Sequence, residues 1–254
     1  MKEVIPMKSV QILTAGQTQA LSYARERLAA AGYSLTDKPS SSVTHLLLPV
    51  PSFAADGSLN GGGDLSQLLS ILPQSTCIIG GNLNNDDLGG RTSYDLLKDP
   101  YYLACNARIT AYCALTIAAQ ALPQTMDQTK TLVIGWGRIG KCLTQLLYSI
   151  GSQVTVAARK ETDRATAKSL GYHAIHPNHI LAEDYHVIFN TAPQLVISNC
   201  NSSCLKIDLA SRPGISGSNI IWARGLPNKY APKSSGRLIA DCVAAYLKET
   251  ETQV

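Results

Sequence analysis

The second half of the chain alternates between two patterns of apolar and polar positions. Five short apolar runs predict β-strands, at residues 131–134, 153–158, 187–190, 204–209 and 220–222. After the first run, Leu143, Leu146, Leu147 and Ile150 recur at helical spacing, and Gly151 follows as a helix-ending glycine. A second, shorter helix is expected at residues 165–170. This alternation predicts an α/β fold built on a doubly wound parallel sheet.

The first hundred residues repeat the alternation less clearly. Apolar runs predict strands at 10–13, 43–48 and 76–79, and periodic segments predict helices at 19–31, 65–72, 103–122 and 238–247. We therefore expect a second, smaller α/β lobe over residues 1–105, completed by a C-terminal helix at 237–254. The nucleotide-binding domain is expected over residues 106–236, with the helix at 103–122 between the two.

Composition excludes several classes of protein. The 254 residues carry 22 Lys and Arg against 18 Asp and Glu, a net charge of +4 with no basic run longer than two residues, which argues against nucleic-acid binding. No apolar run is long enough for a membrane span, and the charged N-terminal segment lacks the features of a signal peptide. Seven cysteines without a Cys-x-x-Cys pair predict reduced thiols in a cytoplasmic protein.

The strongest motif is a glycine turn between the strand predicted at 131–134 and the helix that follows it, Gly135-Trp-Gly137-Arg138-Ile139-Gly140. In a strand–turn–helix context this spacing is typical of Rossmann dinucleotide-binding domains. Gly135 permits the tight turn, Gly137 allows the pyrophosphate to approach the backbone, and Gly140 lets helix and strand pack closely. The pyrophosphate is expected at the helix N-terminus, where N–H groups are free. A glycine turn without a ligand is the alternative.

The end of the second strand bears on the choice of cofactor. An NAD site places a carboxylate there for the ribose hydroxyls, whereas this chain has Arg159 and Lys160. Two cations fit a 2′-phosphate, which a guanidinium can hold through two hydrogen bonds. The sequence therefore favours NADP over NAD. A solvated cationic strand end is the alternative interpretation.

Three loops that follow strands or precede the last helix carry further candidates. Arg212 and Ser211 follow the strand at 204–209, at the sheet edge where Rossmann ligands bind. Arg212 could bind a substrate carboxylate, or it could form a buried ion pair with Asp208. Lys233 and Ser234 precede the last helix and could form an anion site, or the serines could simply cap the helix.

The loop at residues 190–193 follows another strand at the same sheet edge. Asn190 and Thr191 could contact the nicotinamide or its ribose, and Pro193 stiffens the loop. We assign Asn190 and Lys233 as candidate catalytic residues, and Thr191 and Pro193 to the cofactor site. Lys233 could act as a base only if burial lowered its pKa.

A metal site is not expected. His173, His176 and His179 have a spacing that suggests one, but Pro177 interrupts any helix between them. No cysteine or carboxylate joins them at ligand spacing. Solvated imidazoles are the favoured interpretation.

Several segments resemble the signature segments of the A subunit of dipicolinate synthase. The clearest are Lys206-Ile-Asp208-Leu-Ala-Ser211-Arg212-Pro213-Gly214 and the segment from Gly225 to Gly236, which contains Ala-Pro232-Lys233-Ser-Ser. The glycine turn, the Ala-Arg strand end and Asn190-Thr191-Ala192-Pro193 lie in the same order as in that family. Leu48-Pro49-Val50-Pro51, Asp56-Gly57 and Asn106 with Thr110-Ala111 extend the resemblance over nearly the whole chain.

The resemblance implies an NADP-linked oxidoreductase subunit of sporulating bacteria. Members of the family act on a cyclic dicarboxylate of the lysine pathway to give pyridine-2,6-dicarboxylate, together with a second, flavoprotein-like polypeptide. We further expect a homo-oligomer and, from the three loops that carry Arg212, Lys233 and Asn190, a small dicarboxylate substrate held between the lobes. The family usually has an acid where this chain has Gln17, and a glutamate where it has Tyr112.

The two missing carboxylates leave alternative functions open. One is a nucleotide-binding regulatory or scaffold protein of the same fold that has lost catalysis. Another is a different NADP-dependent dehydrogenase, such as one of the shikimate dehydrogenase type, although the Pro-Gly and Ala-Pro-Lys segments do not support it.

Overall fold

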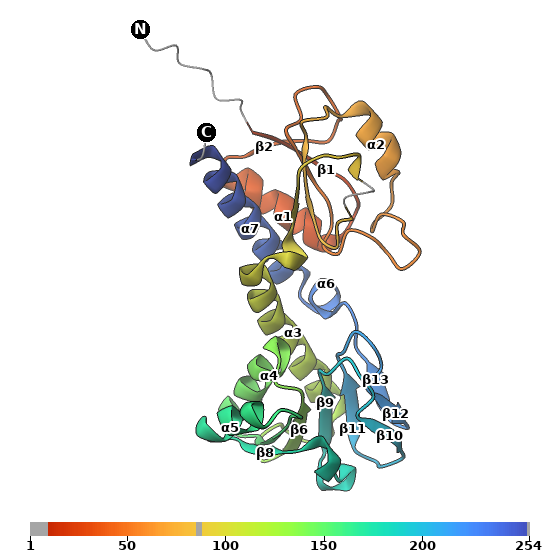
Figure 1. Ribbon diagram of the computed structural model, residues 1–254, viewed down its shortest axis with the longest axis vertical. Helices are drawn as coiled ribbons and strands as arrows, with labels where there is room; N and C mark the ends of the chain where they lie inside the picture. Colours follow the sequence, from red (N-terminus) through yellow and green to blue (C-terminus); the bar gives the residue numbers. More distant parts are fainter. Residues whose placement is uncertain (1–9, 85–87, 253–254) are drawn as a thin grey trace. The chain divides into compact units, whose positions relative to one another are not determined.

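The computed structural model describes residues 10–84 and 88–252, which form two compact units (Figure 1). One unit contains the chain up to Cys105 and again from Pro232, and the other runs from Asn106 to Ala231. Residues 1–9, in the charged N-terminal segment without signal-peptide features, lie outside the described residues. Of the helices within them, none has the length and apolar character needed to cross a lipid bilayer.

The first unit is a five-stranded parallel sheet with strand order β2-β1-β3-β4-β5. Its strands are β1 (Gln11–Thr14), β2 (Ser34–Thr36), β3 (His45–Leu47), β4 (Cys77–Gly80) and β5 (Ser93–Asp95). Its helices are α1 (Gln19–Ala30), α2 (Leu65–Ile71), the short η2 (Leu96–Lys98) and α7 (Pro232–Thr252), and α3 (Pro100–Ala121) begins here. The side chains of Thr18 and Asp64 cap α1 and α2 by accepting hydrogen bonds from backbone N–H groups of the first turn, a role for which Thr and Asp are preferred.

The last helix, α7, lies alongside α1 (Figure 1). Gly236 of α7 lies directly against the α1 backbone at Ala20 and Ala24, and Arg27 pairs with Asp241 at 2.7 Å. The helix begins at Pro232, earlier than the periodic pattern at 238–247 suggests. Proline is well suited to the first helical position, because its missing N–H would have no partner there. The boundary between the units thus falls before residue 232 rather than at 237.

The second unit is a six-stranded parallel sheet with order β13-β11-β9-β6-β7-β8. Its strands are β6 (Lys130–Ile134), β7 (Gln153–Ala157), β8 (His173–Ile175), β9 (Val187–Asn190), β11 (Leu205–Asp208) and β13 (Ile220–Trp222). A separate parallel pair joins β10 (Ile197–Cys200) to β12 (Ile215–Gly217). The order runs outward in both directions from β6, so it reverses between β6 and β9. The predicted doubly wound parallel sheet is confirmed.

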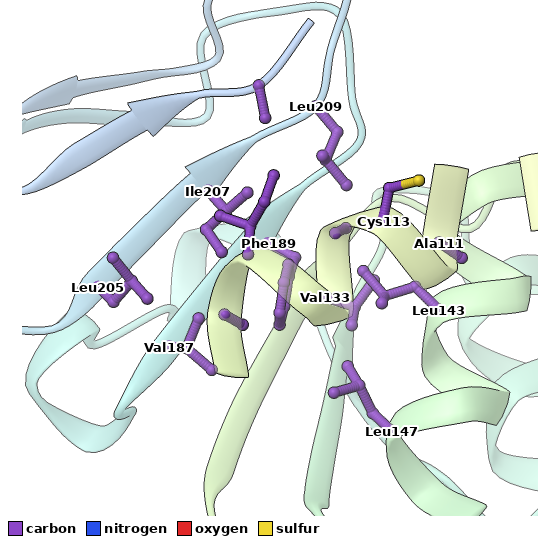
Figure 2. Close-up of a cluster of buried hydrophobic side chains, with 14 of the residues drawn as sticks. Ala111, Cys113, Val133, Leu143, Leu147, Val187, Phe189, Leu205, Ile207 and Leu209 are labelled. Carbon is purple, nitrogen blue, oxygen red and sulfur yellow. The ribbon is translucent and has the colours of Figure 1, made fainter. Parts of the chain in front are cut away.

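Helices and strands of this unit share a core that explains the uninterrupted apolar runs. The helices are α4 (Arg138–Ser149), α5 (Glu161–Ser169), α6 (Leu226–Tyr230) and the short η3 (Pro177–His179) and η4 (Ala182–Asp184). Figure 2 shows Val133 and Phe189 of the sheet packed with Leu143 of α4 and Cys113 of α3. Neighbouring strand residues, such as Leu132, belong to a different cluster. Strands buried on both faces are largely apolar, as expected in a parallel sheet, and the exceptions are buried polar residues such as Lys206 and Asp208 of β11.

Candidate functional site

The glycine turn between β6 and α4 has the geometry that a nucleotide phosphate needs. Gly135 has φ +102°, a conformation that side chains disfavour, and a Cβ there would lie 2.5 Å from Oγ1 of Thr191. A Cβ at Gly140 would collide with the carbonyl of Gly135, so helix and strand could not pack as closely. A Cβ at Gly137 would meet no atom within 4 Å. The approach to Gly137 at the start of α4 is therefore open.

A pocket of about 270 Å³ adjoins this turn at the carboxyl ends of β6 and β7. It is lined by Ile134, Gly135, Trp136, Gly137, Ala157, Ala158, Arg159, Lys160, Asp163, Pro177, Thr191, Ala192, Pro193, Gln194 and Val196. Six of the predicted cofactor residues lie together here: Gly135, Gly137, Arg159, Lys160, Thr191 and Pro193. Of the other three, Arg138 is exposed on the first turn of α4, Ile139 packs against the core, and Gly140 is buried.

The end of β7, which carries the cationic residues Arg159 and Lys160, is held in place by a third cationic residue, Arg164. Arg164 of α5 donates from Nη1 to the carbonyls of Ala158, at 2.8 Å, and Arg159. The side chains of Arg159 and Lys160 remain exposed. The N-terminus of α5, at Lys160, has no side-chain cap, so its first N–H groups are open to an anion.

The pocket also contains an acid that was not among the predicted site residues. Asp163 lies on the first turn of α5, three residues after Lys160, and lines the same pocket. The sequence argument for NADP considers only the residues at the end of the strand, where an NAD site would place a carboxylate for the ribose hydroxyls. The helical turn that follows brings Asp163 back toward the strand, which a linear motif does not show.

Thr191 ties the loop after β9 to the glycine turn. Its backbone N–H and its hydroxyl both donate to the carbonyl of Ile134, at 2.9 and 2.8 Å. The loop therefore forms one wall of the pocket in a fixed position, with Pro193 exposed at its rim.

Asn190 has a structural role that the sequence did not reveal. Its side chain is fully buried; Nδ2 donates to Oδ1 of Asp208 at 2.8 Å and to the Ala192 carbonyl at 3.1 Å, and Oδ1 accepts the Ala192 N–H. An amide with its donors and acceptor engaged and no exposed surface cannot reach a ligand in this conformation. The structure thus corrects the expectation that the Asn190 side chain faces the nicotinamide or the substrate.

Asp208 is also buried, and its partners differ from the arginine that the sequence suggested as an alternative. Its carboxylate accepts the backbone N–H groups of Ala210, Gly214 and Ile215, at 3.1, 2.6 and 3.2 Å, besides the amide of Asn190. Arg212 is not among these partners. The alternative of a buried Asp208–Arg212 ion pair is therefore wrong, because the loop folds back so that its own N–H groups satisfy the carboxylate.

Two other residues of the signature segments are structural as well. Lys206 is fully buried, and its Nζ donates to the carbonyls of Ser202, Cys204 and Ser218 at 2.8 to 3.0 Å. A side chain at Gly214 would collide with Nδ2 of Asn190. Much of the segment at 206–214 therefore serves to hold the loop after β11.

The exposed members of the predicted substrate site lie on two units. Arg212 and Ser211 are exposed after β11 in the unit of Asn106–Ala231, whereas Lys233 and Ser234 belong to the other unit. Lys233 and Ser234 lie on the first turn of α7, so Ser234 does not cap the helix. The Lys233 side chain is not buried within its unit, so the burial that would make it a base is not met there.

The two positions where the family usually carries acids are both exposed. Gln17 follows β1, and its N–H donates to the Gly61 carbonyl at 3.1 Å. Tyr112 lies on α3, 47% exposed, with the guanidinium carbon of Arg108 5.9 Å from its ring centroid.

Other features of the described residues do not add to this site. A larger hollow of about 1190 Å³ lies beside α2, but no predicted site residue lines it, and its Arg91 donates to the carbonyls of Leu69 and Leu72. The ring of His176 accepts the Asn178 N–H at 3.2 Å. Within residues 10–84 and 88–252, no three His, Cys, Asp or Glu side chains are grouped so as to hold a metal ion.

Comparison with known proteins gives one curated relative and many similar folds. No family model matches the chain. The chain is 28% identical over 163 residues to the A subunit of dipicolinate synthase from Bacillus subtilis (strain 168), over 58% of this chain and 55% of that protein. The match thus spans about half the length of this relative.

Solved structures of low sequence identity share the fold over most of the chain. The A subunit of dipicolinate synthase from Bacillus halodurans has a TM-score of 0.79 at 21% identity, covering 94% of this chain and 98% of that one. The A chain of dipicolinate synthase from Bacillus subtilis has 0.80 at 20%, covering 97% and 98%. A transhydrogenase from Sinorhizobium meliloti has 0.68 at 15%, covering 94% of both chains. The sequence match and the shared fold together confirm the predicted resemblance of this chain to the A subunit of dipicolinate synthase.

Proposed function

We propose that the chain is an NADP-linked oxidoreductase subunit that acts on a cyclic dicarboxylate of the lysine pathway to give pyridine-2,6-dicarboxylate. The resemblance to the A subunit of dipicolinate synthase supports the substrate class, and the pocket beside the glycine turn supports the cofactor. The observation that carries the cofactor assignment is the open approach to Gly137 at the uncapped start of α4.

The residues around the turn fit a dinucleotide. The first N–H groups of α4 have no side-chain cap, so a pyrophosphate would satisfy them and interact with the helix dipole. A nicotinamide cofactor supplies the two-electron redox chemistry that arginine and lysine side chains cannot perform. The strand order reverses between β6 and β9, the place where doubly wound sheets bind dinucleotides.

The charges at the end of β7 favour NADP over NAD. Arg159 and Lys160 are exposed beside the pocket and could pair with a 2′-phosphate, together with the open N-terminus of α5. Asp163 is the observation that favours NAD, because a carboxylate in this position could accept hydrogen bonds from the ribose hydroxyls. Two cations against one acid leave the pocket net positive, which favours the phosphate.

For the substrate we keep Arg212 and Ser211 as carboxylate ligands, with Lys233 and Ser234 as further candidates. Neither Arg212 nor Lys233 is committed to a structural ion pair among the described residues. With Asn190 engaged in the loop, Lys233 is the remaining candidate catalytic residue. A second, flavoprotein-like subunit would then contribute to the redox step.

The regulatory or scaffold alternative is favoured by two observations. The two positions where relatives usually have acids are Gln17 and Tyr112, and Asn190 has a structural role. Turnover separates the proposals: NADP⁺-dependent production of pyridine-2,6-dicarboxylate, or its NADPH-dependent consumption, supports an enzyme. Binding without turnover, with and without a second subunit, supports a regulatory role.

The cofactor assignment is tested by calorimetry with NADPH and NADH. We expect tighter binding of NADPH, and Arg159→Ala should weaken NADPH by about 1–3 kcal/mol while leaving NADH nearly unchanged, since a charge-assisted contact is lost. Lys168→Ala, at an exposed cation in the last turn of the following helix, α5, is the matched control. Equal affinity of the unmodified protein for both nucleotides would contradict the NADP assignment.

A second variant tests the position of the pyrophosphate. Gly137→Val should abolish nucleotide binding without disturbing the fold, because its Cβ has free space in the protein alone but occupies the phosphate position. Normal NADPH binding by this variant, with an unchanged circular dichroism spectrum, would show that the site lies elsewhere.

A further inference from the structure

The carboxyl end of the edge strand β13 carries an exposed aromatic residue stacked with an arginine. Trp222, the last residue of β13, is 55% exposed. The guanidinium carbon of Arg224 lies 4.4 Å from its ring centroid, within the range of a cation–π contact. Arg224 also donates from Nη2 to the carbonyl of Ser211, in the loop after β11. These two contacts hold the guanidinium in place and use one of its five N–H donors.

The loop that Arg224 contacts carries a second exposed cation. Arg212 directly follows Ser211, so two arginines belong to adjoining loops at the ends of β11 and β13. Neither forms an ion pair with a carboxylate among the described residues. The acid nearest in the sequence, Asp208, is 1% exposed and accepts four hydrogen bonds from other groups. The two positive charges at this edge are therefore not balanced locally.

The place of these residues in the sheet relates them to the cofactor pocket. That pocket lies mainly at the carboxyl ends of β6 and β7, on one side of the point where the strand order reverses, and the loop after β9 closes it from the other side. The strands β9, β11 and β13 extend from the other side of this point. In doubly wound folds a dinucleotide crosses the reversal point, so its second half and the reacting partner lie toward these strands.

We propose that Trp222, Arg224 and Arg212 form the binding surface for a planar ring that carries two carboxylates. The exposed indole offers an apolar contact to the ring, and the two guanidinium groups pair with the carboxylates through two hydrogen bonds each. Arginine suits this role because its planar group both stacks and binds carboxylates. The inference rests on the proposed function and adds Trp222 and Arg224 to the substrate site.

The chemistry of the surface sets the ligand class. A ligand with one carboxylate would leave one arginine unpaired, and a non-planar ligand would lose contact with the indole. We therefore expect pyridine-2,6-dicarboxylate to bind at least tenfold more tightly than pyridine-2-carboxylate, which corresponds to about 1.4 kcal/mol.

The test is a calorimetric titration of the whole chain with pyridine-2,6-dicarboxylate, with and without saturating NADPH. Trp222→Ala and Arg224→Gln should each weaken binding at least tenfold, whereas Trp222→Phe should retain most of the affinity. Two controls should leave the affinity for the dicarboxylate unchanged: Tyr148→Ala, which removes an aromatic side chain 57% exposed on α4, and Lys168→Gln. NADPH affinity should be the same in all variants.

The outcomes separate this inference from the proposed function. If NADPH binds but the dicarboxylate does not, or if neither Trp222→Ala nor Arg224→Gln weakens it, the inference is wrong and the cofactor site stands. If the dicarboxylate binds as expected without NADPH binding, the cofactor proposal fails instead. If Trp222→Ala changes the sedimentation coefficient and leaves dicarboxylate affinity unchanged, the surface is a contact between protomers and the inference is overturned.

Discussion

Replacing Asp208 by asparagine should destabilise the Asn106–Ala231 unit severely, although the two side chains have nearly the same shape. The carboxylate accepts hydrogen bonds from four donors, the amide of Asn190 and the N–H groups of Ala210, Gly214 and Ile215. Both of its oxygens are engaged, and the residue is 1% exposed. An asparagine has one acceptor oxygen and, in place of the other, an NH₂ group that can only donate.

The magnitude follows from the donors that lose their acceptor. If the new oxygen faces Gly214 and Ile215, the new NH₂ faces the Asn190 amide and the N–H of Ala210, so two buried donors are unpaired. At about 1–3 kcal/mol for each, the expected loss is roughly 2–6 kcal/mol. Rotating the amide of Asn190 does not help, because its oxygen already accepts the Ala192 N–H. A domain of this size is stable by about 5–15 kcal/mol, so the loss is a large fraction of the total.

The chain offers a convenient probe for this measurement. Its two tryptophans, Trp136 and Trp222, both lie in the Asn106–Ala231 unit, so intrinsic fluorescence during urea denaturation reports on that unit. Asp184→Asn, at an exposed acid of η4, is the matched control and should leave the midpoint unchanged. A loss below about 0.5 kcal/mol for Asp208→Asn, the range of ordinary surface substitutions, would refute the assigned hydrogen bonds.

Two further predictions concern helix packing and thiol reactivity. Gly236→Ala should lower the melting temperature measured by circular dichroism, because the new Cβ would lie 2.6 Å from Cβ of Tyr23 and 2.9 Å from the Ala24 nitrogen. The cost of overpacking, roughly 1–3 kcal/mol, exceeds the gain in helix propensity of about 1 kcal/mol. An unchanged or higher melting temperature would show that α1 and α7 separate easily. Burial raises the pKa of the Cys242 thiol to about 12, so this thiol is protonated at about pH 8. Iodoacetamide should therefore modify the half-buried Cys142 faster than Cys242, as peptide mass spectrometry would show; equal rates at these two cysteines would contradict this.

The fold was predictable wherever the apolar pattern was long enough. All strands of four or five residues in the six-stranded sheet of the second unit, β6, β7, β9 and β11, coincide with predicted strands, because strands buried on both faces are largely apolar. The exceptions, such as Lys206 and Asp208 in β11, are buried with their polar atoms hydrogen-bonded. The missed strands of the two large sheets, β2, β5 and β8, have three residues each and lie in no run of three apolar residues. The equally short β3 and β13 were predicted because such runs mark them, at residues 46–48 and 220–222. The missed β10 and β12 form a separate pair, in which Ser198 and Asn199 of β10 are exposed. A half-exposed strand of four residues resembles a loop in composition.

The candidate site was predictable only where single residues in a local motif determine the geometry, as at the glycine turn. The turn at 135–140 was, since Gly135 and Gly140 have steric reasons within the protein itself, and Gly137 leaves the approach to the helix N-terminus open. The pairing of Asn190 with Asp208 was not, because it joins residues 18 apart through the register of β9 and β11. Nor was the stacking of Arg224 on Trp222, since it depends on the course of the chain after β13.

The signature segments of this chain therefore contain two kinds of residue that look alike in the sequence. Lys206, Asp208 and Asn190 are polar residues in such segments, and each is fully or almost fully buried with its polar atoms engaged. A buried polar group that loses its partner costs more than a surface contact, so these positions tolerate little change even in a protein without activity. Arg212 lies in the same segment as Lys206 and Asp208 but is exposed, and the fold does not depend on it. An exposed arginine is accessible to a ligand, which is why substitutions at the exposed arginines, rather than at the buried polar residues, test what the protein binds.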